Sequence, residues 1–156
     1  MVAIRKSFEE GHRRKFLVVV DETSEADRAI VYAAKRAERT NGIATLLYVI
    51  APGDFQHWLG VEDIMRAEAR ENAENCLEKA ADRVRSVART EPELVVREGN
   101  RSDEILALIE EDADIAILVL AAGSGSEGPG PLVSAIAGKG AASFPIPVTI
   151  VPATLD

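Results

Sequence analysis

The chain contains few cysteines, histidines and aromatic residues among its 156 residues. A single cysteine, Cys76, excludes an intramolecular disulfide, and it lies in a helical pattern where a free thiol packs as a small hydrophobic group. The two histidines, His12 and His57, lack the spacing to other ligand residues that metal sites show, so no metal site is expected. Aromatic residues make up 4% of the chain, so the core must be built from aliphatic side chains.

Long apolar runs and an excess of positive charge are also missing. No stretch approaches the ~18 apolar residues of a membrane helix, and the opening MVAIRKSFEEGHRRK has no apolar secretory core. The net charge of −8 argues against a broad nucleic-acid or anionic-membrane surface, because binding phosphates needs a basic field. We therefore expect a cytoplasmic protein that has neither nucleic acid nor a membrane as its partner.

Five aliphatic segments alternate with helical patterns along the chain. Their continuous apolar runs are typical of strands buried on both faces, and they lie at residues 16–20, 43–50, 94–96, 115–122 and 147–151. The segments between them read as helices, including a long one over 61–89 and a short one over 135–143. We expect Thr23 or Ser24 to cap the first helix, Asn41-Gly42 to end it, and Ser102 to cap the third.

This alternation of strands and helices predicts the fold. It demands a parallel sheet with helices on both faces, which right-handed crossovers wind into a sandwich. The expected fold is therefore an α/β protein with a five-stranded parallel sheet, a doubly wound three-layer α/β/α sandwich. It spans residues 15–156 as one domain, behind an N-terminal extension over residues 1–14. The charged residues of the long helix, Glu68, Lys79 and Arg83 among them, are predicted to form a solvated face.

A glycine-rich segment, AAGSGSEGPGPLVS at residues 121–134, follows the fourth predicted strand. Gly123, Gly125 and Gly128 spell G-x-G-x-x-G, but the dinucleotide fingerprint belongs after the first strand and is followed by an acid ~20 residues later. A Walker A loop also fails, because Gly138-Lys139 is followed by Gly140. What remains is a loop whose backbone N–H groups can approach an anion at the start of a helix.

Several segments together resemble the universal stress protein family over roughly residues 15–152. KFLVVVDETSEADRAIVYAAKRA resembles the family's first strand, its Asp and its capped helix, and LLYVIAP its second strand. REGNRSDEILALIEEDADIAILVL resembles the glycine turn, third helix and fourth strand, and FPIPVTIVP the closing strand. The resemblance implies the adenine nucleotide alpha hydrolase-like sandwich described above, ATP binding at the strand ends and dimers that pair their last strands.

The resemblance also implies positions for a nucleotide. Asp21, with Glu22 and Thr23, would lie near the adenosine, and Val49 would offer backbone contacts to adenine. The phosphate motif G-x2-G-x9-G-[ST] fits in two registers: one starts at Gly125 and ends on Lys139, and the preferred one starts at Ala121 and is degenerate. The residues expected around the phosphates are Ala121, Gly123, Ser124, Gly125, Gly128, Gly130, Ser134 and Ala135.

The expected function is that of a stress-response regulatory or protective protein. It would bind an adenine nucleotide, with ATP expected and Mg²⁺ as an optional companion, and form a homodimer through Val148 to Val151. The alternative is a dimeric interaction module of the same fold that binds no nucleotide, which the degenerate loop and its two prolines favour. No Ser-His-Asp or Cys-His arrangement is present, so no enzyme is expected, with slow ATP hydrolysis as a third reading.

Overall fold

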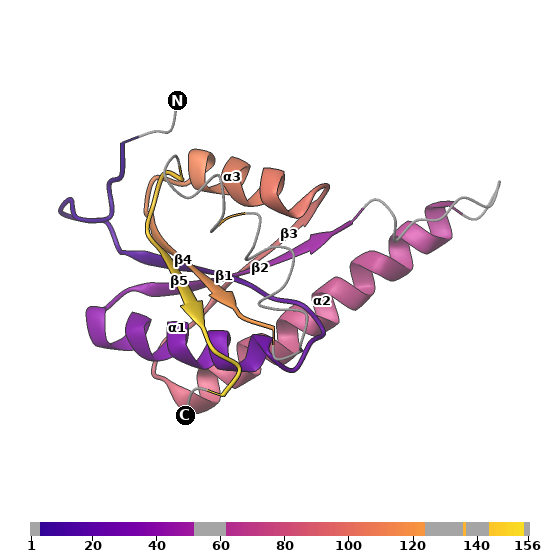
Figure 1. Ribbon diagram of the computed structural model, residues 1–156, viewed down its shortest axis with the longest axis horizontal. Helices are drawn as coiled ribbons and strands as arrows, with labels where there is room; N and C mark the ends of the chain where they lie inside the picture. The colour runs from indigo at the N-terminus through magenta and orange to yellow at the C-terminus, as the bar shows by residue number, and fades with distance from the viewer. Residues whose placement is uncertain (1–3, 52–61, 124–135, 137–143, 155–156) are drawn as a thin grey trace.

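The computed structural model describes residues 4–51, 62–123, 136 and 144–154 (Figure 1). Five strands and three helices alternate in these ranges. The strands are β1 (Lys15–Val19), β2 (Ile43–Ile50), β3 (Glu93–Glu98), β4 (Ile115–Ala121) and β5 (Val148–Val151). The helices are α1 (Ala26–Thr40), α2 (Glu62–Val87) and α3 (Arg101–Glu111). The five predicted strands and the first three predicted helices are confirmed, although β3 is longer than the segment 94–96. The predicted helix over 135–143 lies outside the described residues, apart from a helical Ile136.

All neighbouring strands pair in parallel, in the order β3-β2-β1-β4-β5. Helices α1 and α2 cover one face of this sheet, and α3 covers the other (Figure 1). The five-stranded parallel α/β sandwich is therefore confirmed. The strand order, which the sequence pattern did not predict, places β1 at the centre and β3 and β5 at the edges.

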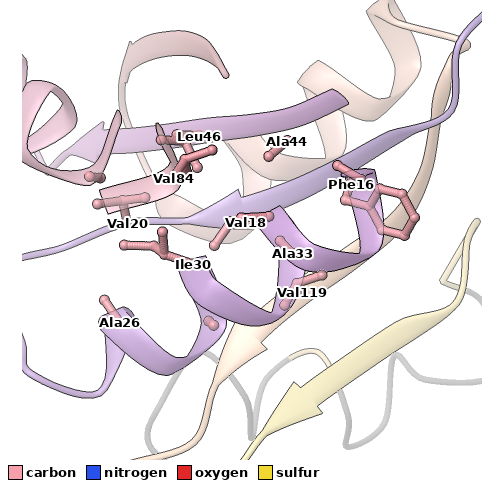
Figure 2. Packing of buried hydrophobic residues seen from close by; sticks show 14 of the residues in the cluster. Phe16, Val18, Val20, Ala26, Ile30, Ala33, Ala44, Leu46, Val84 and Val119 are labelled. Atoms are coloured by element: carbon pink, nitrogen blue, oxygen red, sulfur yellow. The ribbon is translucent and has the colours of Figure 1, made fainter. Parts of the chain in front are cut away.

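Two apolar clusters hold the layers together, one on each face of the sheet. Side chains alternate along each strand, so Val18 and Leu46 pack with α1 and α2, while Leu17 and Leu47 pack with α3. Figure 2 shows the first of these clusters, in which small alanines of α1 let the helix approach the strands closely. The four strand residues named here are 0% exposed, which explains why the sequences of the inner strands β1 and β2 are apolar on both faces.

The helix ends differ from the predictions in two of three cases. Asn41 ends α1 as expected, with a left-handed φ of 54°. The residue before α1 is Glu25, whose side chain makes no capping bond, because the N–H groups of Ala26 and Asp27 bond to the carbonyls of Thr23 and Ser24. The predicted side-chain caps at Thr23 and Ser24 are therefore wrong. Asn100 caps α3 in place of Ser102, with its Oδ1 accepting from the Asp103 N–H.

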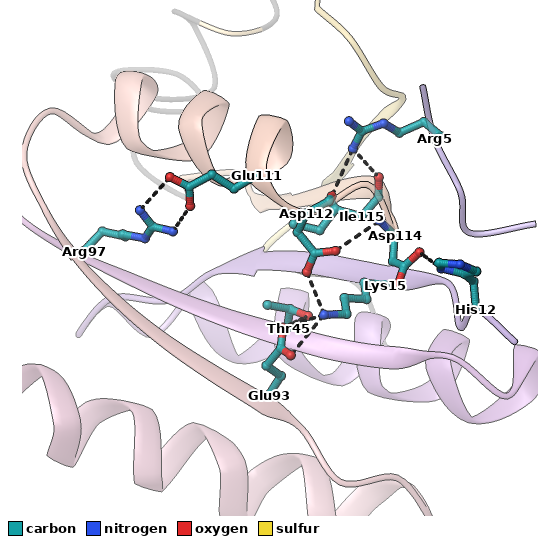
Figure 3. A network of polar contacts seen from close by, with 10 residues as sticks. All are labelled: Arg5, His12, Lys15, Thr45, Glu93, Arg97, Glu111, Asp112, Asp114 and Ile115. Carbon is teal, nitrogen blue, oxygen red and sulfur yellow. Dashed lines mark hydrogen bonds and ion pairs between the residues drawn. The ribbon is translucent and has the colours of Figure 1, made fainter. Parts of the chain in front are cut away.

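A polar network fastens the amino edge of the sheet (Figure 3). The ammonium of Lys15, the first residue of β1, donates to Asp112 and Glu93. Residues 4–14 run beside the turn between α3 and β4, where the Arg5 guanidinium donates to the carbonyls of Asp112 and Ile115. These contacts tie residues 4–14, predicted as an extension, to the sandwich. They lie at the opposite edge from the carboxyl ends of the strands.

Candidate functional site

Three of the predicted site residues, Asp21, Val49 and Ala121, mark the carboxyl ends of the three central strands β1, β2 and β4. Val19 of β1 pairs with Leu47 of β2, so the register carried two residues further brings Asp21 beside Val49. Val18 pairs with Val119 of β4, and this register carried three residues further brings Asp21 to the level of the residue after Ala121. In the sheet, β2 and β3 lie on one side of β1, and β4 and β5 lie on the other. Parallel sheets bind ligands at the carboxyl ends of the strands where the strand order reverses in this way.

The turn after β1 is organised around Asp21. One carboxylate oxygen of this half-buried side chain accepts hydrogen bonds from the Thr23 N–H at 2.9 Å and from its hydroxyl at 2.5 Å. This side-chain turn fixes the first two residues after the strand and explains why Thr23 does not cap α1. The second oxygen of Asp21 accepts no hydrogen bond from any residue that the structure describes, so it remains available to a ligand.

Glu22 and Val49 lie near the same end of β2, where Tyr48, which contacts Glu22, and Val49 point to opposite faces of the sheet. The Tyr48 hydroxyl donates to Glu22 at 2.8 Å, which holds the exposed carboxylate over the end of β2. The Val49 side chain is 3% exposed and packs in the cluster on the α3 face, so only its backbone faces the edge. Backbone recognition at Val49 is therefore the form of contact that the structure permits.

Helix α2 contributes a wall to the site that the sequence did not predict. The Cys76 thiol donates to the backbone carbonyl of Asp21 at 3.5 Å. Burial raises the pKa of this thiol, and the nearby Glu22 and Asp21 carboxylates raise it further. Cys76 was expected as a packing residue, and it packs against the α1/α2 cluster as well as touching the turn after β1.

A cavity of about 470 Å³ opens between this turn, the start of α1 and the middle of α2. Asp21, Glu22 and Thr23 line one side, and Asn75, Lys79 and Arg83 line the other. A smaller cavity of about 280 Å³ adjoins it beyond Glu22 and includes Glu68. The predicted solvated face of α2 includes Glu68, Lys79 and Arg83, which are exposed, and these three residues also border the cavities. Lys79 and Arg83 are four residues apart and Glu68 lies eleven residues before Lys79, so all three share one helix face, but this spacing alone does not distinguish a cavity wall from a solvated face.

The described residues cover only part of the predicted phosphate loop. Ala121 ends β4, and Gly123 follows it at the carboxyl edge. The other expected phosphate contacts lie outside the described residues: Ser124, Gly125, Gly128, Gly130, Ser134 and Ala135. Among the residues with described positions, no group of three His, Cys, Asp or Glu side chains is placed to hold a metal ion. The described helices include none that is long and apolar enough to cross a membrane.

The family model of the universal stress protein family matches residues 12–152. The chain belongs to the universal stress protein family. Solved structures of the family share its fold: a universal stress protein, UspA, from Lactobacillus plantarum superposes with a TM-score of 0.72 at 18% identity, covering 90% of this chain and 99% of that one. Among curated protein sequences, none matches the chain.

Two other similar structures were solved as complexes. A universal stress protein in complex with cAMP superposes with a TM-score of 0.63 at 18% identity, covering 91% of this chain and 98% of that one. The universal stress protein from Archaeoglobus fulgidus in complex with dAMP has a TM-score of 0.60 at 20% identity, covering 97% and 99%. At these sequence identities, the structural similarity shows only that the two proteins share their fold with this chain.

Proposed function

We propose that this universal stress protein binds an adenine nucleotide at the carboxyl edge of its sheet, between β1 and β4, with ATP as the expected ligand and Mg²⁺ as its optional companion. The observation that carries the proposal is the position of Asp21 at the strand-order reversal, with one carboxylate oxygen fixed by Thr23 and the other available. Two family members solved with cAMP and dAMP support an adenine nucleotide as the ligand class.

Each group at this edge has a chemical role in the proposal. The available oxygen of Asp21 accepts a ribose hydroxyl, and the Asp21–Thr23 turn keeps the carboxylate from rotating away. The backbone at Val49 contacts the base. Residues 121–135, which include the glycine-rich segment, hold the phosphates through backbone N–H groups.

Calorimetry with a charge-neutral variant tests the proposal. We expect the wild-type chain to bind ATP at micromolar concentration, and Asp21→Asn to bind it about tenfold or more weakly, because a hydrogen bond to a charged group is lost. Asp82→Asn is the matched control, since Asp82 is an exposed carboxylate of α2 that pairs with Arg85. AMP, cAMP and GTP titrations define the specificity. No heat and no thermal shift with ATP–Mg would refute nucleotide binding and favour the interaction module.

The proposed role is binding in a stress-responsive regulatory or protective protein of the cytoplasm, without catalysis. A phosphate-release assay compares wild type with Asp21→Ala. Equal slow rates identify a contaminant, whereas a rate that falls only in the variant would establish hydrolysis at this site.

We also propose a homodimer through β5. This strand is an edge of the sheet, and its Ile150 side chain is 39% exposed, so antiparallel pairing with a second copy covers backbone groups and apolar surface together. Light scattering should give a dimer for wild type and a monomer for Ile150→Lys. Leu94→Lys is the control, because Leu94 is an exposed residue of β3, the opposite edge strand, and this variant should remain dimeric. A monomeric wild type contradicts the proposal.

A further inference from the structure

The larger cavity beside Asp21 has an apolar floor and a polar rim. Its floor is formed by Val20, which directly follows β1, with Ala26, Ile30 and Ala80 from the two covering helices. Figure 2 shows Val20, Ala26 and Ile30 gathered at the start of α1, on the face of the sheet that α1 and α2 cover. A volume of about 470 Å³ is within the range of small-molecule sites, and the lining suits a ligand with a compact apolar part.

The two sides of the rim carry opposite charges that the described residues leave unneutralised. Asp21 and Glu22 stand on the β1 side, where Thr23 and Tyr48 donate to one oxygen of each carboxylate, and neither carboxylate forms an ion pair within the described ranges. Lys79 stands on the α2 side and likewise has no hydrogen bond or ion pair with a described residue. The other cation of this wall, Arg83, is occupied by Asp27 at 2.8 Å.

Two amides lie beside Lys79 on the same wall. Asn72 and Asn75 line the cavity about two turns and one turn before Lys79, respectively, and neither makes a hydrogen bond with the part of the chain that the structure describes. Each amide both donates and accepts, so the wall can bind the carboxylate oxygens and the N–H groups of one ligand. A purely anionic ligand would meet two carboxylates, and a purely cationic one would meet Lys79.

We infer that this cavity binds a small zwitterion, an α-amino acid with an aliphatic side chain. Its ammonium group pairs with Asp21 and Glu22, its carboxylate pairs with Lys79 and the amides, and its side chain lies on the apolar floor. This assignment is separate from nucleotide binding at the strand ends, although Asp21 borders both sites. Lys79 and Asn75 line this cavity and do not belong to the proposed nucleotide site, so substitutions of these two residues test the cavity separately.

L-leucine and its two single-charge analogues test the charge pattern. Ligand-observed NMR and calorimetry should detect L-leucine binding at millimolar or lower concentration. Isoamylamine, which lacks the carboxylate, and 4-methylpentanoate, which lacks the ammonium group, should each bind about tenfold or more weakly, since each loses a charge-assisted contact. Glycine should also bind more weakly, because it leaves the floor uncovered.

Two exposed substitutions test the residues without disturbing the core. Lys79→Gln and Asn75→Ala should each weaken L-leucine binding, by about tenfold for Lys79→Gln. Lys35→Gln is the matched control, because Lys35 is an exposed lysine of α1 outside the cavity, and it should leave the affinity unchanged. The inference is overturned if L-leucine gives no signal, if either analogue binds as tightly as L-leucine, or if Lys79→Gln keeps the wild-type affinity. None of these results depends on whether ATP binds.

Discussion

Replacing Lys15 by Met tests how the amino edge of the sheet is fastened. Its ammonium donates at 2.6 Å to Asp112, and at 3.0 and 3.1 Å to the two oxygens of Glu93 (Figure 3). The Lys15 side chain is 14% exposed, while those of Asp112 and Glu93 are 23% and 41% exposed. Met keeps the length of the side chain and its apolar stem, so the change removes the charge and its three contacts.

The expected loss in the free energy of unfolding is about 2 kcal/mol. Exposed ion pairs contribute about 0.2–1 kcal/mol, whereas removing one partner of a buried pair costs about 3–5 kcal/mol. The Lys15 network lies between these limits, because a nearly buried cation faces two partly solvated carboxylates. In a domain of this size, about 2 kcal/mol lowers Tm by about 4–8 °C.

Urea denaturation of a double-mutant cycle measures this effect. Lys15→Met, Asp112→Asn and the double variant should give a coupling free energy of about 1 kcal/mol, since Glu93 keeps part of the interaction in Asp112→Asn. Arg85→Gln is the control for an exposed pair, because Arg85 and its partner Glu91 are 42% and 70% exposed. Its loss should stay below about 0.5 kcal/mol.

The pH dependence has a defined sign. Burial opposes the charge on Lys15, but hydrogen bonds to Asp112 and then Glu93 outweigh it and raise the pKa of the ammonium group. A raised folded-state pKa means that the stabilisation is complete below the unfolded value of about 10.4 and is lost as the pH rises through the folded value. The stability difference between wild type and Lys15→Met should therefore shrink at alkaline pH. A difference under about 0.5 kcal/mol at neutral pH, or one unchanged at alkaline pH, would refute this reasoning.

Three further perturbations probe local features. Asn100→Ala should lower the free energy of unfolding by about 1 kcal/mol in urea denaturation, whereas Asn100→Asp keeps the cap of α3; equal losses would contradict the capping role. Asn41→Gly should raise the free energy of unfolding by about a few tenths of a kcal/mol in the same assay, because φ is 54° there, and a lower free energy would show that the Asn side chain itself stabilises the helix end. Cys76 should react slowly with iodoacetamide at neutral pH, since burial raises the pKa of its thiol. Mass spectrometry measures the rate, and rapid alkylation of the folded chain would contradict this prediction.

The sequence predicted the elements well because their signals are local. Ile43–Ile50 is apolar apart from Thr45, since both faces of an inner parallel strand are covered, and Asn41-Gly42 marks a helix end by its own backbone preference. The caps were harder to predict. Ser102 and Asn100 both offer suitable oxygens, and the path of the chain out of β3 decides which one meets the free N–H group. The strand order was not predictable for a related reason, because an apolar run does not record which neighbour it pairs with.

The residues of the candidate site likewise fall into those that local sequence signals predict and those that depend on how the helices pack. Asp21 lies just after β1 and Val49 lies near the carboxyl end of β2, so a parallel sheet brings both to the same end of the strands, and their prediction needed only the element types. Asn75 and Lys79 line the same cavity as Asp21 because α2 crosses the sheet beside the start of α1, and that crossing depends on how alanines of both helices pack. A helix pattern separates a buried stripe from a solvated one, but it does not say which polar residues at the boundary face a neighbouring strand end. The wall that α2 contributes could therefore be identified only from the packed structure. We expect the ligand preferences that are particular to this chain, rather than common to its fold, to depend on that wall.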